Sequence, residues 1–349
     1  MPSQIPNGNG NSEIGINFFM QCLQNSKWLL ILCSLLTGIV ASIYAFNSQE
    51  WWSSSEIITE ANYNDLSSLR NDVSPLFIVA AKTEKLEKIF SPNKIFIDFI
   101  NEYNKPLTKS EFILSNDLLK IKMSNQKLEE EQQKNAFVKF WSNKIKYKKQ
   151  GDNFKLIFES NSAEESQLLL SQYSKFVHER VKNNIIDDVK SRIVSLVSLL
   201  EVKNDVLNEA VKANIKLEVE ITKLALSVTK ASNFSNPIEN VNGDNFLPIE
   251  LGSKALSEKY KVLSAVDDFS IFDPEIHRIK SEIKMLNDID VNYEMEFNVI
   301  GYVNVAELPL NSDKPKRSLI VIIGLFIGLF LGCVISVYRE SSRYYNKEK

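Results

Sequence analysis

An uncharged run near the C-terminus, SLIVIIGLFIGLFLGCVISVY at residues 318–338, decides the class of this protein. Its 21 residues are enough to cross a hydrocarbon core about 30 Å thick as a helix that rises about 1.5 Å per residue. A second uncharged run, WLLILCSLLTGIVASIYAF, occupies residues 28–46. Runs of this length are rare inside soluble proteins, so the sequence predicts two transmembrane helices.

Small residues recur at every fourth position of both runs. In water, each glycine inside a helix would cost roughly 1 kcal/mol relative to alanine, whereas in lipid small residues allow helices to approach closely. The C-terminal run carries Gly324, Gly328 and Gly332. The N-terminal run carries Ser34, Gly38 and Ser42. We expect these two tracks to pack span against span, within one subunit or between subunits.

The charges beside the first run predict its orientation. Lys27 precedes it and Glu50 follows it, which places the N-terminus in the cytoplasm. Because 27 residues precede the run and no small-x-small cleavage site follows, an uncleaved anchor is favoured over a signal peptide. We expect a cytoplasmic tail at 1–27, a span at 28–46 and a periplasmic domain at 47–317. A second span at 318–338 and a cytoplasmic tail at 339–349 follow. Three basic residues oppose this orientation, although long loops translocate largely regardless of charge: Lys314, Lys316 and Arg317.

Composition restricts the compartment and the chemistry. The chain is 44% hydrophobic and 24% charged with a net charge of −3, which fits neither a disordered acidic chain nor a nucleic-acid binder. Residues 47–317 contain no cysteine and form no disulfide, which is consistent with a bacterial envelope protein. The chain has no P-loop, GxSxG, HExxH or paired CxxC motif, and its two histidines, His178 and His277, lie about 100 residues apart. We expect no catalytic centre, no cofactor and no metal site.

Both ends of the large loop have strand-like patterns. Four segments alternate as half-buried strands do: 51–60, 118–123, 154–159 and 296–305. Residues 76–104 are expected to form two helical pieces divided at Ser91-Pro92. Strands from the two ends are expected to meet in a membrane-proximal α/β base, formed by residues 47–160 and 290–310.

Between these ends the chain has no Gly or Pro from residue 152 to 236, which favours a helix over about 163–232. Its length would be about 105 Å at 1.5 Å per residue. A seven-residue apolar stripe follows this stretch and includes Ile193, Leu200, Leu207 and Ile221. Such a helix needs partner helices along its length, from its own chain or from neighbouring copies. Residues 253–289, broken near Asp273-Pro274, supply return helices.

Two polar residues interrupt the stripe, Asn214 and Lys203. One interpretation is loose local packing, or a helix face turned to solvent in a plain coiled-coil stalk. The alternative hypothesis is that they set the register between neighbouring helices, because a polar residue at a core position of a coiled coil specifies register.

Several stretches occur together in one order along the chain. They are Glu13-Ile14 and Lys27-Trp28 before the first span, WWSSSEIIT at 51–59 with Trp51 and Trp52, FLPIELGSKAL at 246–256 with Leu251 and Gly252, and Pro309 and Pro315 before the glycine-rich span. Together they resemble the polysaccharide co-polymerase family, the Wzz-type O-antigen chain-length determinants.

The resemblance implies an α+β inner-membrane protein of a Gram-negative bacterium, with two membrane helices, a membrane-proximal α/β base and a long helical hairpin in the periplasm. It also implies a ring of several copies that regulates the modal length of lipopolysaccharide O-antigen. The implied partners are the membrane polymerase and the lipid-linked glycan. Members of the family are regulators and have no known catalytic centre.

Three other functions compete with this one. The same fold would serve as a co-polymerase for a capsule, an exopolysaccharide or a polymer of the enterobacterial-common-antigen type. A tyrosine kinase of the related capsule systems would need a nucleotide-binding domain after the second span, and 11 residues follow Tyr338. A two-span coiled-coil signalling protein would need a cytoplasmic output domain.

Overall fold

The computed structural model describes residues 26–80, 84–128, 130–237 and 246–347. Most of the predicted N-terminal tail, with Cys22 and the Glu13-Ile14 stretch, lies outside these residues. The chain forms two compact units. The first, here the base unit, comprises residues 1–58, 104–175 and 302–349, and the second, here the hairpin unit, comprises residues 59–103 and 176–301.

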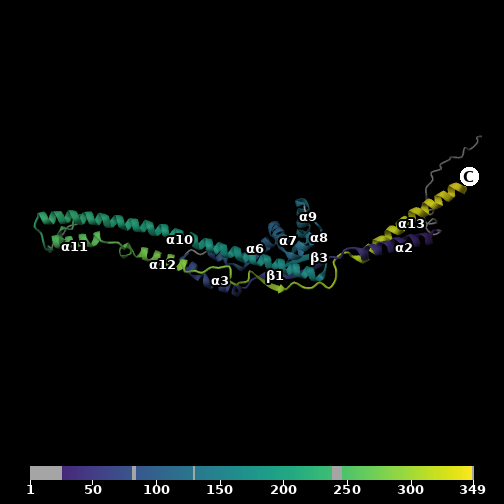
Figure 1. Cartoon of the computed structure of the whole chain (residues 1–349), viewed down its shortest axis with the longest axis horizontal. Helices are drawn as coiled ribbons and strands as arrows, with labels where there is room; N and C mark the ends of the chain where they lie inside the picture. The colour runs from purple at the N-terminus through teal and green to yellow at the C-terminus, as the bar shows by residue number, and fades with distance from the viewer. Residues whose placement is uncertain (1–25, 81–83, 129, 238–245, 348–349) are drawn as a thin grey trace, which may run out of the picture. The chain divides into compact units, whose positions relative to one another are not determined.

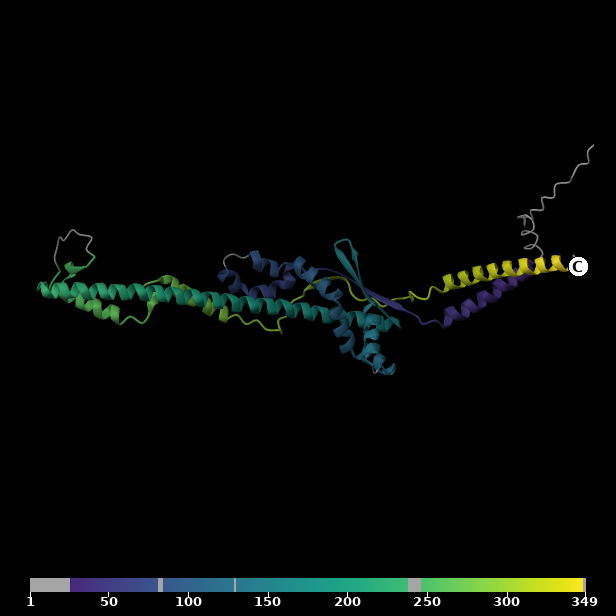
Figure 2. The same cartoon turned by 90° about the horizontal axis from the view of Figure 1, so that it is seen from above.

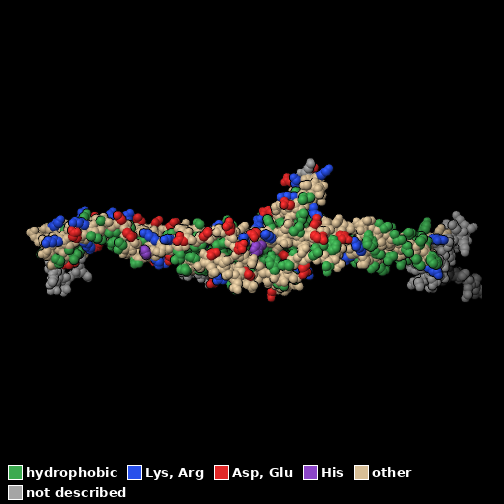
Figure 3. Space-filling view, turned by 60° about the horizontal axis from the view of Figure 1, so that its bottom comes forward, with side chains coloured by type: hydrophobic (Ala, Val, Ile, Leu, Met, Phe, Trp, Pro, Cys, Tyr) green, Lys and Arg blue, Asp and Glu red, His purple; other side chains and the backbone are tan. Residues whose placement is uncertain are grey.

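Two long apolar helices stand at the membrane end of the base unit: α2 (Lys27–Asn47) and α13 (Arg317–Lys347). Both are long and apolar enough to cross a membrane, and they lie side by side in Figures 1 and 2. Hydrophobic side chains gather over this pair in Figure 3. The apolar part of α13 ends near Arg339, while the helix itself continues beyond the predicted span.

The four strands form one sheet in the order β2-β3-β1-β4. They are β1 (Trp52–Glu60), β2 (Ile145–Gln150), β3 (Asn153–Ser160) and β4 (Ile300–Asn304). β3 pairs antiparallel with both β1 and β2, with Trp52 opposite Ser160 and Ile145 opposite Phe158. Strands from both ends of the loop therefore meet in one sheet, as the alternating patterns predicted.

The prediction of a strand at 118–123 is wrong. These residues lie in helix α8 (Asp117–Asn125), where the Asn116 side chain caps the first turn by accepting a hydrogen bond from the Leu119 backbone N–H. The missed strand is β2, which the sequence presented as a run of charge. Only the first of its six residues is buried, so this edge strand has no alternation to reveal it.

Helices α7 (Pro106–Ser115) and α9 (Glu131–Ser142) complete the base unit with the start of α10. Its core is aromatic: Phe112 lies 4.9 Å from Tyr173 between ring centroids, and Phe158 lies 6.4 Å from both Phe112 and Trp141. All four rings are buried. They hold the inner face of β3 against α7, α9 and the start of α10.

The hairpin unit is built around α10 (Ala163–Ala231), a continuous helix of 69 residues, close to the predicted 163–232. Return helices α11 (Gly252–Ser264) and α12 (Pro274–Asn287) run alongside it (Figures 1 and 2), with the break at Asp273 where it was expected. The remaining helical pieces are short: η1 (Tyr63–Leu66), α3 (Ser67–Asp72), α4 (Ser74–Val79), α5 (Glu84–Ile89) and α6 (Pro92–Asn104).

These short helices join the hairpin unit, although the predicted base extended over 47–160. Their contacts explain the difference. The Ser68 hydroxyl donates to the Glu296 carbonyl oxygen at 2.7 Å, and the Asn298 N–H donates to the Asp65 carbonyl at 3.3 Å. Arg180 of α10 pairs with Glu102 of α6 at 2.8 Å.

Strand β1 carries a buried carboxylate, Glu56, that is 3% exposed. Its Oε1 atom has no hydrogen-bond partner among the described residues. Burial raises the pKa of Glu56 from 4.5 to about 7, because the charged form loses its hydration. The folded protein therefore keeps a proton on Glu56 that the unfolded chain releases near pH 4.5. Retaining this proton stabilises the folded state at low pH, and that stabilisation is lost as the pH rises through about 7.

Glu56→Gln should remove this pH dependence. We expect the variant to match the wild type near pH 4.5 and to exceed its free energy of unfolding at pH 8 by up to roughly 3 kcal/mol, because burial raises the pKa of Glu56 from 4.5 to about 7. Urea unfolding of the detergent-solubilised full chain at both pH values measures it. Glu60→Gln, at the exposed end of β1, is the control. Equal pH profiles for wild type and Glu56→Gln would contradict the assignment.

Candidate functional sites on the membrane helices and the hairpin

The three glycines of α13 all face α2. A methyl group at Gly324 would overlap Ala41, and one at Gly328 would overlap the Thr37 hydroxyl and lie 2.7 Å from the Cys33 carbonyl oxygen. At Gly332 it would lie 3.1 Å from the Leu30 Cα atom. Residue numbers rise along one helix as they fall along the other, so the helices are antiparallel. Glycine is required here for close backbone approach.

The row of α2 that meets these glycines is Leu30, Cys33, Thr37 and Ala41, one position before the predicted serine and glycine track. Of the predicted track, Ser34 donates to the Leu325 carbonyl at 3.1 Å, and a methyl at Gly38 would lie 2.7 Å from the Leu325 side chain. Ser42 donates within its own helix to the Gly38 carbonyl at 2.8 Å. The predicted track therefore borders the contact row, which also uses alanine and threonine.

Where the two helices leave the membrane segment, backbone hydrogen bonds join them. The Trp51 N–H donates to the Lys314 carbonyl at 2.9 Å, and the Asp313 N–H donates to the Trp51 carbonyl at 2.8 Å. Arg317 pairs with Glu50, and Lys314 approaches Glu159 at 3.5 Å. Two of the three basic residues that opposed the predicted orientation thus have acidic partners. Pro309 and Pro315 lie half-buried in this connection, and Trp52 begins β1 beside it.

Gly252 lies at the far turn of the hairpin, after the half-buried Leu251. Its φ is +75°, and a Cβ atom there would lie 2.7 Å from the Asn236 carbonyl carbon and oxygen. The next residue, Ser253, donates its N–H to the Phe234 carbonyl at 2.9 Å. The backbone of the turn therefore needs glycine for both its dihedral angle and its space.

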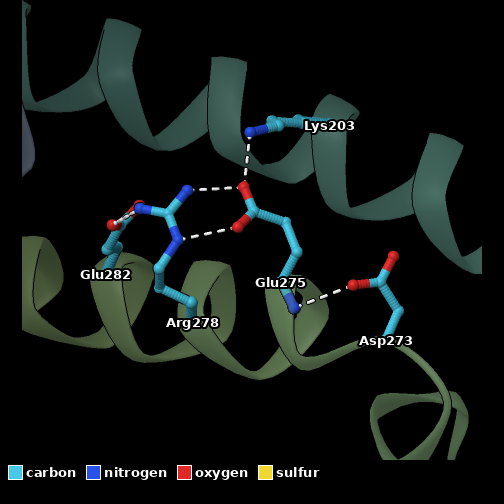
Figure 4. Close-up of polar contacts among 5 residues, drawn as sticks. All are labelled: Lys203, Asp273, Glu275, Arg278 and Glu282. Atoms are coloured by element: carbon cyan, nitrogen blue, oxygen red, sulfur yellow. Dashed lines mark hydrogen bonds and ion pairs between the residues drawn. The ribbon is translucent and has the colours of Figure 1, made fainter.

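Ion pairs hold the return helices on α10. Lys203 donates to Glu275 of α12 at 2.6 Å, and Arg278 links the same carboxylate to Glu282 (Figure 4). These contacts lower the pKa of Glu275 to about 2, led by the hydrogen bond from Arg278. Lys203 thus has a partner within its own chain, whereas Asn214 is exposed.

The predicted seven-residue stripe does not stay on one face of α10. Ile193, Leu200, Leu207 and Ile221 are half-buried, while Leu224 and Val228, later in the same pattern, are exposed. Seven residues fall about 20° short of two full turns, so the pattern turns by about 100° between residues 193 and 228. The straight helix carries the stripe from the packed side to the outer side.

A second apolar row remains on one outer face of α10, here the outer stripe. Its spacing of three, four and four residues repeats every 11 residues, which is close to three full turns. Its members are Leu199, Val202, Val206, Ala210, Ala213, Leu217, Ile221, Leu224 and Val228. All are exposed except the half-buried Ile221. The buried residues of the same segment, Thr222, Ala225 and Thr229, lie on the other side, so the outer stripe has no cover within the described chain.

Neither histidine is placed for chemistry. His178 is half-buried on α10, where burial lowers its pKa, and His277 is exposed on α12. Among the described residues, no three His, Cys, Asp or Glu side chains gather in a way that could hold a metal ion.

The chain combines two paired apolar helices, a small sheet and a long helical hairpin, and three comparisons show which known proteins it resembles. A family model described as Wzz, chain length determinant protein, matches residues 12–125. The ECA polysaccharide chain length modulation protein of Salmonella typhimurium is 23% identical over 94% of this chain and 95% of its own length. The chain length determinant protein of the same species is 21% identical over 98% and 97%.

A solved full-length bacterial polysaccharide co-polymerase superposes with a TM-score of 0.65 at 17% identity, over 94% of this chain and 98% of its own. This confirms the predicted fold class. The chain is therefore similar in sequence to chain length determinants of the Wzz type and shares the fold of a polysaccharide co-polymerase.

Two glycines with positive φ allow a test of the hairpin turn. Gly252 combines φ +75° with ψ 161°, a region that glycine alone adopts readily, whereas Gly151 has φ +64° and nothing within 4 Å of a Cβ. Gly151→Ala should cost about 1 kcal/mol from its dihedral angle alone, and Gly252→Ala should cost about 2–3 kcal/mol because of its dihedral angles and its contact with the Asn236 backbone. Thermal unfolding followed by circular dichroism measures both. Equal losses would show that the turn relaxes freely.

The membrane pair can be tested with a cysteine of the chain. A Cβ at residue 332 would lie 3.4 Å from the Cys33 Cβ, close to the 3.5–4.5 Å of disulfides. In a Cys22→Ala, Cys333→Ala background, Gly332→Cys should therefore form an intramolecular disulfide with Cys33 on oxidation in membranes. Adding Gly328→Leu should reduce its yield several-fold, and lipid-exposed Phe326→Leu should not. Cross-links that appear only between copies would contradict pairing within one subunit.

Proposed function

We propose that this protein regulates the modal chain length of lipopolysaccharide O-antigen, as a homo-oligomer in the inner membrane that acts on the membrane polymerase or on the growing glycan. Both termini lie in the cytoplasm, and residues 47–317, with the sheet and the hairpin unit, lie in the periplasm. The role is regulatory, with no chemical step of its own. The match of residues 12–125 to the chain length determinant model and the similarity to named chain length determinants support a chain-length role, and the choice of O-antigen is part of the proposal.

The outer stripe is the observation that supports a homo-oligomer. Six large apolar side chains of α10 stand 42–63% exposed along one face of a water-soluble domain: Leu199, Val202, Val206, Leu217, Leu224 and Val228. Removing such side chains from water stabilises a complex by about 25 cal/mol for each Å² buried. A second copy of the same chain can cover this face with a different surface of its own. Repetition of such a head-to-tail contact around an axis closes a ring, whereas a face that pairs with itself closes a dimer.

The length of α10 gives the mechanism we infer. Its 69 residues span about 104 Å at 1.5 Å per residue. A ring of such helices, anchored by two membrane spans in each copy, presents the polymer with a surface of fixed dimensions. We infer that ring geometry and hairpin length set how long a glycan stays engaged with the polymerase.

Modulation of enterobacterial common antigen is the second candidate function. The observation that favours it is the Salmonella typhimurium relative with that function in its name, which aligns over 94% of this chain. The same architecture would serve either polymer, so the length distributions of both must be compared.

Deleting the gene and complementing it with variants tests the function. We expect the modal band of O-antigen to disappear from lipopolysaccharide gels in the deletion strain and to return with the wild-type gene. An unchanged ladder together with an altered common-antigen ladder would assign the protein to the second polymer. If neither ladder changed, the proposed function would be wrong.

Leu217→Glu, in the centre of the outer stripe, should fail to restore the modal band and should shift cross-linked oligomers toward smaller species. Val194→Glu is the matched control, because Val194 is 66% exposed on the same helix but lies outside the stripe.

Asn214→Leu, beside the stripe, should change oligomer size or homogeneity if Asn214 sets register. An unchanged cross-linking ladder in Asn214→Leu would remove that role.

A further inference from the structure

The base unit contains a cavity that the proposed function does not yet use. It lies among the residues that follow α2, helix α8 and the facing side of α9, and its volume is about 910 Å³. That volume falls within the roughly 300–1,000 Å³ of small-molecule sites. Aromatic and amide side chains dominate its lining, among them Trp51, Phe140, Trp141, Gln49, Gln126 and Gln133. We call it the α8–α9 cavity.

The aromatic wall is rigid and partly open. Phe140 contacts Trp51 at 5.7 Å and Trp141 at 5.8 Å between ring centroids, and it still exposes 47% of its surface. Trp141 is buried, which fixes the base of the wall. The Lys144 ammonium lies 3.4 Å from the centroid of the Trp51 ring and holds that ring in place. The wall thus presents apolar ring surface without needing to rearrange.

The polar part of the lining is almost uncharged. Lys122 is its one ionisable side chain within the described residues, and that ammonium already pairs with Glu165 at 2.9 Å and reaches Asn161 Oδ1 at 3.3 Å. The amides of Gln126 and Gln133 are exposed and can each donate and accept hydrogen bonds. A phosphate or carboxylate ligand would require unpaired cations, preferably arginine. This lining therefore favours a neutral ligand rich in hydroxyl groups.

A pyranose ring has the matching chemistry, because its faces carry C–H groups and its rim carries hydroxyls that both donate and accept. We propose that the α8–α9 cavity binds a neutral segment of glycan, with a sugar face on the exposed Phe140 ring and its hydroxyls on the side-chain amides. The proposal rests on the proposed function for its choice of ligand. Gln49, which lines the cavity, comes two residues after the last residue of α2. One wall of the cavity therefore follows directly on the membrane anchor in the sequence.

A titration with the full-length protein in detergent tests the cavity. The probe is O-polysaccharide of the source strain, freed from its lipid by mild acid, and the signal is the fluorescence of the chain's four tryptophans, two of which line the cavity. We expect saturable binding by the wild type. Phe140→Ala and Gln133→Ala should each raise Kd about tenfold or more, since each removes one ring or hydrogen-bond contact. Both residues are exposed, so the fold should survive, and circular dichroism checks it.

Tyr147→Ala is the matched control, because Tyr147 is an aromatic residue of the base unit, 39% exposed on β2, outside the cavity. It should bind the polysaccharide as the wild type does. Absence of saturable binding by the wild type, or an equal Kd for Phe140→Ala, would overturn the proposal. Vesicles containing phosphatidylglycerol serve as the competing probe. A Phe140-dependent signal from these vesicles alone would assign the cavity to lipid and also overturn it.

The two proposals fail in different ways. If the deletion strain keeps its O-antigen ladder, the proposed function is wrong, while the titration still decides whether the cavity binds glycan. If the deletion removes the modal band but the wild type does not bind the polysaccharide, the chain-length role stands without this cavity.

Discussion

Close packing of α2 against α13 is the contact on which the rest of the structure depends. In lipid, apolar burial does not drive helices together, so the pair relies on contacts that small residues permit. Gly324, Gly328 and Gly332 let α13 approach the backbone of α2. Because the helices are antiparallel, the two ends of the intervening loop emerge side by side. The backbone hydrogen bonds between Trp51 and Lys314 then place the start of β1, which follows α2, beside the connection that precedes α13.

From that starting point, the base unit can form its sheet from segments about 250 residues apart. The order β2-β3-β1-β4 puts β1, which follows α2, between β3 and β4. The Ser54 hydroxyl donates to the Glu307 carbonyl at 2.6 Å, and the Gln167 amide donates to the Ala306 carbonyl at 2.8 Å. The connection leading to α13 is thus fixed to both the first strand and the first turns of α10.

Sequence patterns predicted the elements whose burial is strong and regular. The two spans, β1, β3, α10 and the break at Asp273 all follow from hydrophobic length, alternation or punctuation by Gly and Pro. The predictions failed where burial is weak or the pattern is short. β2 is an exposed edge strand with a lysine-rich sequence, and six residues at 118–123 fit a strand or a short helix equally well until the cap at Asn116 is considered.

The candidate sites differ in the same way, because those with a regular sequence pattern could be predicted and the others could not. The glycines of α13 could be singled out because three small residues at one interval are unusual, whereas Thr37 and Ala41 on α2 have no such signal. A seven-residue repeat does not reveal the outer stripe, because a helix as straight as α10 does not keep such a repeat on one face. The α8–α9 cavity joins residues from three distant segments and has no local pattern at all.

The outer stripe has a consequence for how the hairpin could change in length. An insertion of 11 residues into α10 adds about 16 Å and restores both the inward and the outward face, because 11 residues complete close to three turns. Insertions of two or five residues would rotate everything beyond them by about 140–200° and take both faces out of line. Co-polymerases of this design are therefore free to lengthen mainly in steps that preserve the helix phase, which makes the reach of the hairpin a stepwise property.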